Sequence, residues 1–141
     1  MPILLPAARE SFESFADLVV LIVDDDKISS LLLLTTLKNL NLTTLTAING
    51  QEAVVMVDQH PEINLVLMDV KMPLMNGYEA TTLIKKLRPE LPVIVQTAFT
   101  SKEEEAKAKE AGCDGFMTKP INTNDLLALM KKLLKSSAHN Y

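Results

Sequence analysis

The sequence predicts an α/β protein in which a doubly wound, five-stranded parallel sheet is covered by helices on both faces. Short apolar runs alternate five times with segments whose apolar residues recur at helical spacing. Several of these runs are apolar throughout and rich in β-branched residues, which is typical of parallel strands buried on both faces. Five such units in one chain of 141 residues fit a single sheet joined by right-handed crossovers.

The first two strand-helix units lie in the N-terminal half of the chain. Residues 18–23 form an apolar run that predicts a buried strand, and the leucines of residues 27–40 recur at helical spacing. Residues 42–48, with several threonines, predict the second strand. An Asn-Gly pair then predicts a turn into a helix over residues 51–59.

The other three units follow the same order. Residues 63–68 predict a third buried strand, and Asn76 with Glu79 forms the capping-box pattern that begins a helix. Residues 92–97 predict the fourth strand. The last predicted elements are a helix over residues 101–111, a strand over residues 114–118 and an amphipathic helix that includes Leu126 and Leu134.

One domain is expected, because a hydrophobic content of 48% is sufficient for a single packed core. We assign residues 1–17 to a linker or N-terminal extension, residues 18–135 to the domain and residues 136–141 to a C-terminal tail.

The composition argues against several classes of function. A net charge of −4 disfavours a nucleic-acid-binding surface, which is normally basic. A single cysteine, Cys113, excludes an internal disulfide and favours a reducing, cytoplasmic compartment. The apolar runs are too short to span a bilayer, so we expect no direct membrane contact.

Polar residues follow four of the predicted strands. The carboxyl ends of parallel strands meet at one edge of a sheet, so these side chains should converge there. Clustered carboxylates remain ionised when a cation offsets their charge, and oxygen ligands with open positions suit Mg²⁺. The residues are Asp24, Asp25 and Asp26 after the first strand, Asp69 after the third, Thr97 at the end of the fourth, and Lys119 after the fifth.

This set of groups is suited to phosphoryl transfer. A carboxylate beside Mg²⁺ can attack phosphorus while a lysine and a hydroxyl stabilise the charge on the other oxygens. Asp69 is the expected nucleophile, because it stands alone at the end of a central strand, whereas Asp24 and Asp25 are paired as ligands. Asp26 directly precedes a predicted helix and is expected to be its N-cap.

Four motifs resemble those of the receiver domains of two-component response regulators: VDDD, MDVKMPLMNG around Asp69, QTA at the fourth strand, and the Lys119-Pro120 pair. The resemblance extends from about Leu18 to Leu134. It implies the flavodoxin-like (βα)5 receiver fold with strand order 2-1-3-4-5. It also implies that Asp69 is the phosphoacceptor, Asp25 a direct Mg²⁺ ligand, Asp24 a ligand largely through water, and Lys71 a ligand through its backbone carbonyl.

The resemblance assigns further roles at the phosphoryl group. Thr97 and Lys119 would bind phosphoryl oxygens, and the Lys119-Pro120 bond is expected to be cis. Phe116 occupies the position of the family's aromatic switch residue. In the family the residues two positions beyond the phosphoacceptor and the threonine influence hydrolysis. Here they are Lys71 and Phe99, neither suited to orient water, so we expect slow loss of the phosphoryl group.

The resemblance also implies partners. The phosphoryl donor would be a histidine kinase or a histidine phosphotransfer protein, and phosphorylation could drive homodimerisation, although a solvated face explains residues 101–111 equally well. Residues 31–34 are four leucines, so some leucine should face outward. Such a leucine could dock a helix that bears the phosphohistidine; the alternative is that neighbouring elements cover it.

The segments MNGYEAT, QTAFT and EAGCDGFMTKPI are similar to those of receivers in hybrid sensor histidine kinases, so we expect this chain to be such a receiver. A free-standing single-domain regulator is the alternative. Two other classes remain. A phosphoaspartate phosphatase needs an acid two residues after Asp69, where this chain has Lys71; an inert docking module would not need the full acid, threonine and lysine set. Whether the chain counts as an enzyme stays open: the resemblance implies His-to-Asp transfer and slow autodephosphorylation, within a parent chain that could be a histidine kinase.

Overall fold

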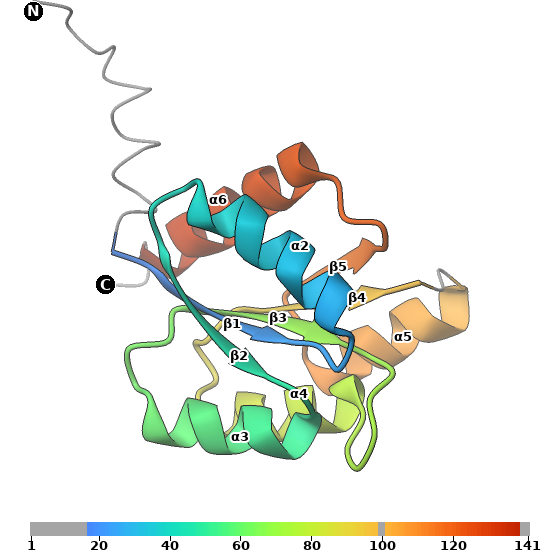
Figure 1. Ribbon diagram of the computed structural model, residues 1–141. Coiled ribbons are helices and arrows are strands. Elements are labelled where there is room, and N and C mark those ends of the chain that lie inside the picture. Colours follow the sequence, from blue (N-terminus) through green and yellow to red (C-terminus); the bar gives the residue numbers. More distant parts are fainter. Residues whose placement is uncertain (1–16, 99–100, 139–141) are drawn as a thin grey trace, which may run out of the picture.

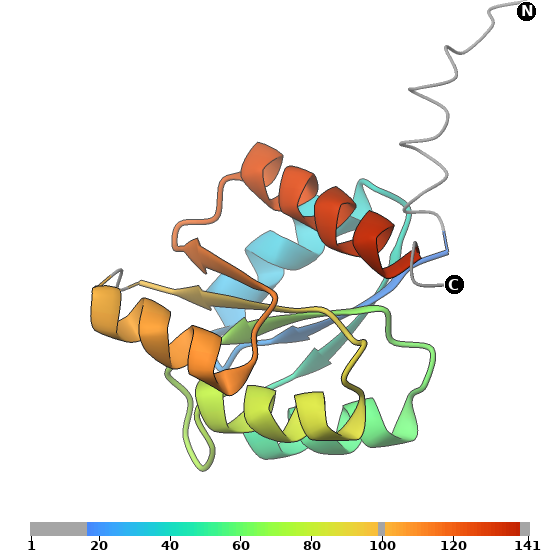
Figure 2. The same ribbon diagram turned by 180° about the vertical axis from the view of Figure 1, so that it is seen from behind.

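A computed structural model describes residues 17–98 and 101–138 and contains a parallel sheet between two layers of helices (Figures 1 and 2). The strands are β1 (Val19–Val23), β2 (Thr43–Ala47), β3 (Leu65–Asp69), β4 (Val93–Thr97) and β5 (Gly115–Thr118). The helices are α2 (Lys27–Lys38), α3 (Gly50–Gln59), α4 (Gly77–Leu87), α5 (Lys102–Ala111) and α6 (Thr123–Ala138). The sheet order is β2-β1-β3-β4-β5 with every neighbouring pair parallel, which confirms the predicted fold class and strand order.

The predicted elements all occur, with shifts at their ends. The first helix ends at Lys38 instead of residue 40, because the chain turns through Asn41 at φ 66° before β2. The third strand begins at Leu65 instead of residue 63, since the Asn64 side chain accepts a hydrogen bond from Val19 N–H (2.8 Å). Residues 1–16, most of the predicted extension, and residues 139–141 of the predicted tail lie outside the described residues.

Two separate apolar clusters hold the layers to the sheet. On one face, alternate strand residues such as Ile22 and Leu67 pack with Leu37 of α2 and Met130 of α6. On the other face, the intervening residues, such as Met68, pack against α3, α4 and α5. All residues of β3 and β4 are buried, which explains their continuous apolar sequence. No helix within residues 17–98 and 101–138 is long and apolar enough to cross a bilayer.

Side-chain caps fix where three of the helices begin. Asn49, Asn76 and Ser101 each accept a hydrogen bond from a backbone N–H of the first turn. The capping box predicted for Asn76 and Glu79 is present in both directions, which confirms it. The start of α4 is therefore fixed by local bonds only a few residues after β3.

Gly77 joins the start of α4 closely to the end of β3. Its N–H donates to the carbonyl oxygen of Val70 (2.8 Å). A Cβ atom added at Gly77 would lie 2.1 Å from the backbone oxygen of Asp69, far inside van der Waals contact. Only glycine allows α4 to begin so near Asp69, so this contact fixes the loop that carries residues 70–76.

We predict that Gly77→Ala destabilises the fold by about 3 kcal/mol, because the new methyl group meets backbone atoms that cannot rotate away. Urea unfolding of both proteins measures the effect. Ala128→Ser, an exposed change on α6, is the control and should alter stability by less than about 0.5 kcal/mol. Equal stability of Gly77→Ala and the wild type would contradict the close approach.

Candidate functional site

The polar residues that follow the strands meet at the carboxyl edge of the sheet, as predicted. Lys119 Nζ lies 3.2 Å from Asp24 Oδ2 and 3.2 Å from Asp69 Oδ1. The Asp24 side chain is completely buried, and those of Asp69 and Lys119 are largely buried. The lysine that directly follows β5 therefore joins the acid that follows β1 and the acid that ends β3.

Three carboxylates gather beside this lysine. One oxygen each from Asp24, Asp25 and Asp69 lies within 4.8 Å of the others. Asp25 is exposed, so the cluster is open to solvent on that side. Three acids with one lysine leave an excess of negative charge, and carboxylate oxygens are the ligands of a hard cation. The donor set thus fits Mg²⁺, which agrees with the expectation from the sequence.

The open side of the cluster borders a cavity of about 520 Å³. Lys71, whose backbone carbonyl is an expected ligand, lines this cavity together with Asp25. Tyr78 and Glu104 also line it, and the Tyr78 hydroxyl donates to the Glu104 carboxylate and lies 3.2 Å from the Glu104 backbone oxygen. This contact between α4 and α5 is not predictable from the sequence, because no local pattern pairs two polar residues on separate helices.

Backbone hydrogen bonds orient the two buried acids. Asp24 N–H donates to Ala47 of β2 (3.0 Å), and Asp24 Oδ1 accepts from Asp26 N–H (2.9 Å). Asp69 Oδ1 accepts from Val70 N–H (3.0 Å) as well as from Lys119. Both contacts of Asp69 use the same oxygen, so Oδ2 is the oxygen available to a ligand or an electrophile.

Burial and neighbouring charges shift the pKa values of Asp69 and Lys119. Burial raises the pKa of the Asp69 carboxyl above its ordinary value; the Lys119 charge opposes this rise and the Asp24 charge adds to it. Burial acts to lower the pKa of Lys119, but the Asp69 and Asp24 carboxylates outweigh it and hold that pKa above its ordinary value. Lys119 therefore remains a cation, while ionised Asp69 carries a free-energy cost in the fold.

The Asp26 side chain takes no part in the cluster. It is the N-cap of α2, as predicted: its carboxylate accepts from Ile28 N–H (3.1 Å) and from the Ser29 hydroxyl (3.0 Å). The Ser29 and Ile28 bonds lower the pKa of this carboxyl. Both of its oxygens serve the helix end.

The remaining predicted residues lie close by. Thr97 ends β4 and is buried, and its carbonyl oxygen accepts from Lys119 N–H (2.8 Å). The Lys119-Pro120 bond is cis, as expected. Phe116 pairs with Val95 across the sheet and is half-buried against the α3, α4 and α5 cluster. Phe99 lies outside the described residues, so its expected effect on hydrolysis stays a prediction.

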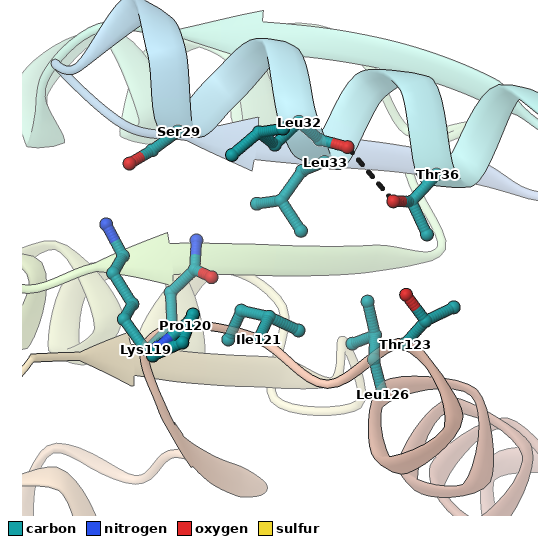
Figure 3. Close-up of a pocket in the computed structure, with 10 residues that line it drawn as sticks. Ser29, Leu32, Leu33, Thr36, Lys119, Pro120, Ile121, Thr123 and Leu126 are labelled. Carbon is teal, nitrogen blue, oxygen red and sulfur yellow. Dashed lines mark hydrogen bonds between the residues drawn. The ribbon is translucent and has the colours of Figure 1, made fainter.

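A groove on the other face lies between α2 and the chain that leads into α6 (Figure 3). Its volume is about 470 Å³. Near it, α2 exposes apolar side chains: Ile28 is 72%, Leu31 62% and Leu32 67% exposed. The prediction that some leucine of residues 31–34 faces outward is confirmed. Gln96, which belongs to the QTA motif at the end of β4, also lines the groove.

Comparison with known proteins identifies relatives of this chain. A family model described as the response regulator receiver domain matches residues 20–131. A hybrid signal transduction histidine kinase (M) of Dictyostelium discoideum is 34% identical over 121 residues, which cover 82% of this chain and 5% of that protein. The sensor histidine kinase RcsC of Escherichia coli (strain K12) is 36% identical over 117 residues, or 83% of this chain and 12% of that protein.

A solved structure is also similar. The crystal structure of a CheY-like response regulator receiver domain protein from Methanospirillum hungatei JF-1 superposes with a TM-score of 0.83 at 30% identity. The match covers 89% of this chain and 99% of that one. The chain thus spans nearly all of the solved archaeal protein but at most about an eighth of the two kinases.

We predict that Asp69→Asn stabilises the fold at pH 7 in the presence of a chelator, and that the gain disappears near pH 3. The folded-state pKa of Asp69 lies above its ordinary value of 3.8, so the cost of ionising it is absent below pH 3.8, grows as the pH rises above that value, and is complete above the folded-state pKa. Asparagine never ionises and avoids this cost. Denaturant unfolding at several pH values measures the difference.

Asp26→Asn is the matched control for this measurement. The pKa of Asp26 is lowered in the fold, so its ionised form stabilises the protein above the ordinary carboxyl pKa of 3.8. This variant should therefore lose stability at pH 7, the opposite sign. A stability gain for Asp69→Asn that is the same at pH 3 and pH 7 would contradict the electrostatic account.

Proposed function

This chain belongs to the response regulator receiver domain family, and from this premise we propose that it accepts a phosphoryl group from a phosphohistidine onto Asp69. The observation that carries the proposal is the contact of Lys119 with Asp69 inside a cluster of three carboxylates. This combination provides a nucleophile, a fixed cation and a set of metal ligands at one place.

Each residue has a distinct role in the proposed reaction. Asp24, Asp25, Asp69 and the backbone carbonyl of Lys71 would hold Mg²⁺, which when bound supplies positive charge to the phosphoryl oxygens. Asp69 Oδ2 attacks phosphorus, the P–N bond of the donor breaks, and its electron pair returns to the donor imidazole. Lys119 Nζ and the Thr97 hydroxyl donate hydrogen bonds to the transferred phosphoryl group.

The receiver would then change shape. Thr97 and Phe116 lie on the neighbouring strands β4 and β5, two rows apart in the sheet register. Movement of the Thr97 side chain toward a phosphoryl group would open space on the face where Phe116 is half-buried. We propose that Phe116 moves further inward and that the surface of α5, β5 and α6 transmits the change, with homodimerisation as one outcome.

The partner in this proposal is a histidine kinase or a histidine phosphotransfer protein. The exposed Ile28, Leu31 and Leu32 of α2 support docking of a helix next to Lys119. Because two relatives are histidine kinases that extend far beyond the matched segment, we propose a cytoplasmic receiver within a hybrid kinase. The archaeal protein, which is matched over nearly its whole length, supports the alternative of a free-standing regulator.

The test of the proposed function is labelling by a protein-free donor. With acetyl phosphate and Mg²⁺, intact-mass measurement should find one added phosphoryl group on the wild type. Asp69→Ala should remain unlabelled, and a chelator should reduce the labelling rate of the wild type by at least about tenfold.

Asp26→Asn is the matched acidic control, since it lies in the same run of acids but caps α2. It should be labelled like the wild type, because asparagine is also a good N-cap. Labelling that persists in Asp69→Ala, or a wild type that cannot be labelled, would exclude the proposal and favour an inert docking module.

We also predict a long lifetime of phospho-Asp69, because the Lys71 side chain is exposed and cannot act as a base or orient water as an amide can. Lys71→Asn keeps the backbone carbonyl and supplies an amide, so hydrolysis should accelerate about tenfold. The decay of labelled protein in Mg²⁺, after acetyl phosphate has been removed, measures both rates. A wild-type lifetime as short as that of Lys71→Asn would refute this account of slow hydrolysis.

A further inference from the structure

Gln96 carries a buried polar group that the proposed chemistry does not use. Its side chain is 2% exposed, and its Nε2 atom has no hydrogen-bond partner within the described residues. Buried amide donors in folded proteins nearly always have a partner, because an unpaired one loses its bond to water without replacement. Gln96 Nε2 therefore needs a partner beyond the described residues.

Gln96 faces the groove between α2 and α6. The groove walls are apolar: Leu32 and Leu33 belong to α2, while Ile121 and Leu126 lie on the opposite side (Figure 3). Its volume of about 470 Å³ falls in the range of sites that hold ligands or inserted side chains. The groove thus combines an apolar wall with one unpaired donor.

Three other polar side chains of the groove are already engaged. The Thr36 hydroxyl donates to the Leu32 carbonyl (3.0 Å; dashed in Figure 3), and the Ser29 hydroxyl donates to Asp26 (3.0 Å). Lys119 is bonded to Asp24 and Asp69. Among these groups, Gln96 Nε2 is the donor that a bound acceptor would satisfy.

The location of the groove indicates what occupies it. Gln96 is the register partner of Asp69 on the neighbouring strand, so the two side chains leave the sheet toward the same face. Lys119 lines the groove and also bonds Asp69. A group in the groove therefore lies beside the phosphoacceptor, and the exposed apolar residues of α2 continue the contact surface. The occupant that fits this continuity is the protein that delivers the phosphoryl group.

We propose that Gln96 donates a hydrogen bond to an oxygen atom of the phosphodonor protein. This oxygen belongs to a glutamine, asparagine, serine or threonine side chain that enters the groove while the phosphohistidine of the same helix faces Asp69. The inference rests on the proposed function and adds a specificity residue to it. A donor with an apolar or cationic side chain at this place leaves Gln96 unpaired, and such mismatches discriminate strongly between partners.

The test compares Gln96→Met with the wild type by phosphotransfer from a panel of purified, autophosphorylated histidine kinases. Methionine keeps the length of glutamine without its donor. We expect transfer from the preferred kinases to fall about tenfold and transfer from poor donors to change little, so that the range of rates narrows. The rate with acetyl phosphate should stay as in the wild type, since this donor has no side chain to insert.

Thr81→Val is the matched control. Thr81 is also fully buried with an unpaired side-chain oxygen, but it lies on α4 against the other face of the sheet. Removing either unpaired group should raise the Tm by roughly 3 °C. Only Gln96→Met should also alter donor preference.

Three results would overturn the inference: an unchanged order of donors in Gln96→Met, a wild type that accepts acetyl phosphate but prefers no kinase, or a lower Tm for Gln96→Met, which would make Gln96 a structural residue. Failure of acetyl phosphate to label the wild type is distinguishable from these, because it refutes the proposed function itself.

Discussion

Crowding of like charges at the carboxyl edge of the sheet is the constraint on which the rest of the site depends. Two unit charges at 4 Å repel by about 4 kcal/mol at an effective dielectric constant of 20, and Asp24, Asp25 and Asp69 lie at comparable separations. Lys119 contacts two of the three acids and offsets part of this repulsion. One cation cannot balance three anions, so the folded protein holds its acids together at a cost that a divalent ion would relieve.

The fold supplies the force that keeps these charges in place. The acids follow β1 and β3, which lie next to each other in the sheet and are buried by helices on both faces. Backbone N–H groups bind Asp24 and Asp69, and Gly77 lets α4 begin directly against Asp69. The packing of the buried strands thus holds the acids in an electrostatically unfavourable arrangement. This is the pattern expected where a protein gives up some stability for function.

The sequence was sufficient for most of this arrangement because its signals are local. Apolar runs locate the strands, and the N-cap residues Asp26 and Asn76 locate the starts of α2 and α4. The parallel order of the strands then brings Asp24, Asp69 and Lys119 to one edge of the sheet. The start of β3 was misplaced, since a long-range bond from Asn64 to β1 decides it. The Tyr78 contact with Glu104 and the unpaired Nε2 of Gln96 were not predictable, because both depend on how side chains of distant segments pack.

The two cavities beside Asp69 lie toward opposite faces of the sheet and differ in chemistry. The cavity lined by Asp25 and Lys71 is bounded by α4 and α5 residues and is open to an acidic side chain, Asp25, that suits a hydrated cation. The groove lined by Gln96 and Leu32 is bounded by α2 and the start of α6 and is mainly apolar. A protein donor seated on α2 would therefore leave the metal side open. Lys119 lies in the groove and also bonds the acids, so recognition of the donor and binding of the phosphoryl group meet at this one side chain.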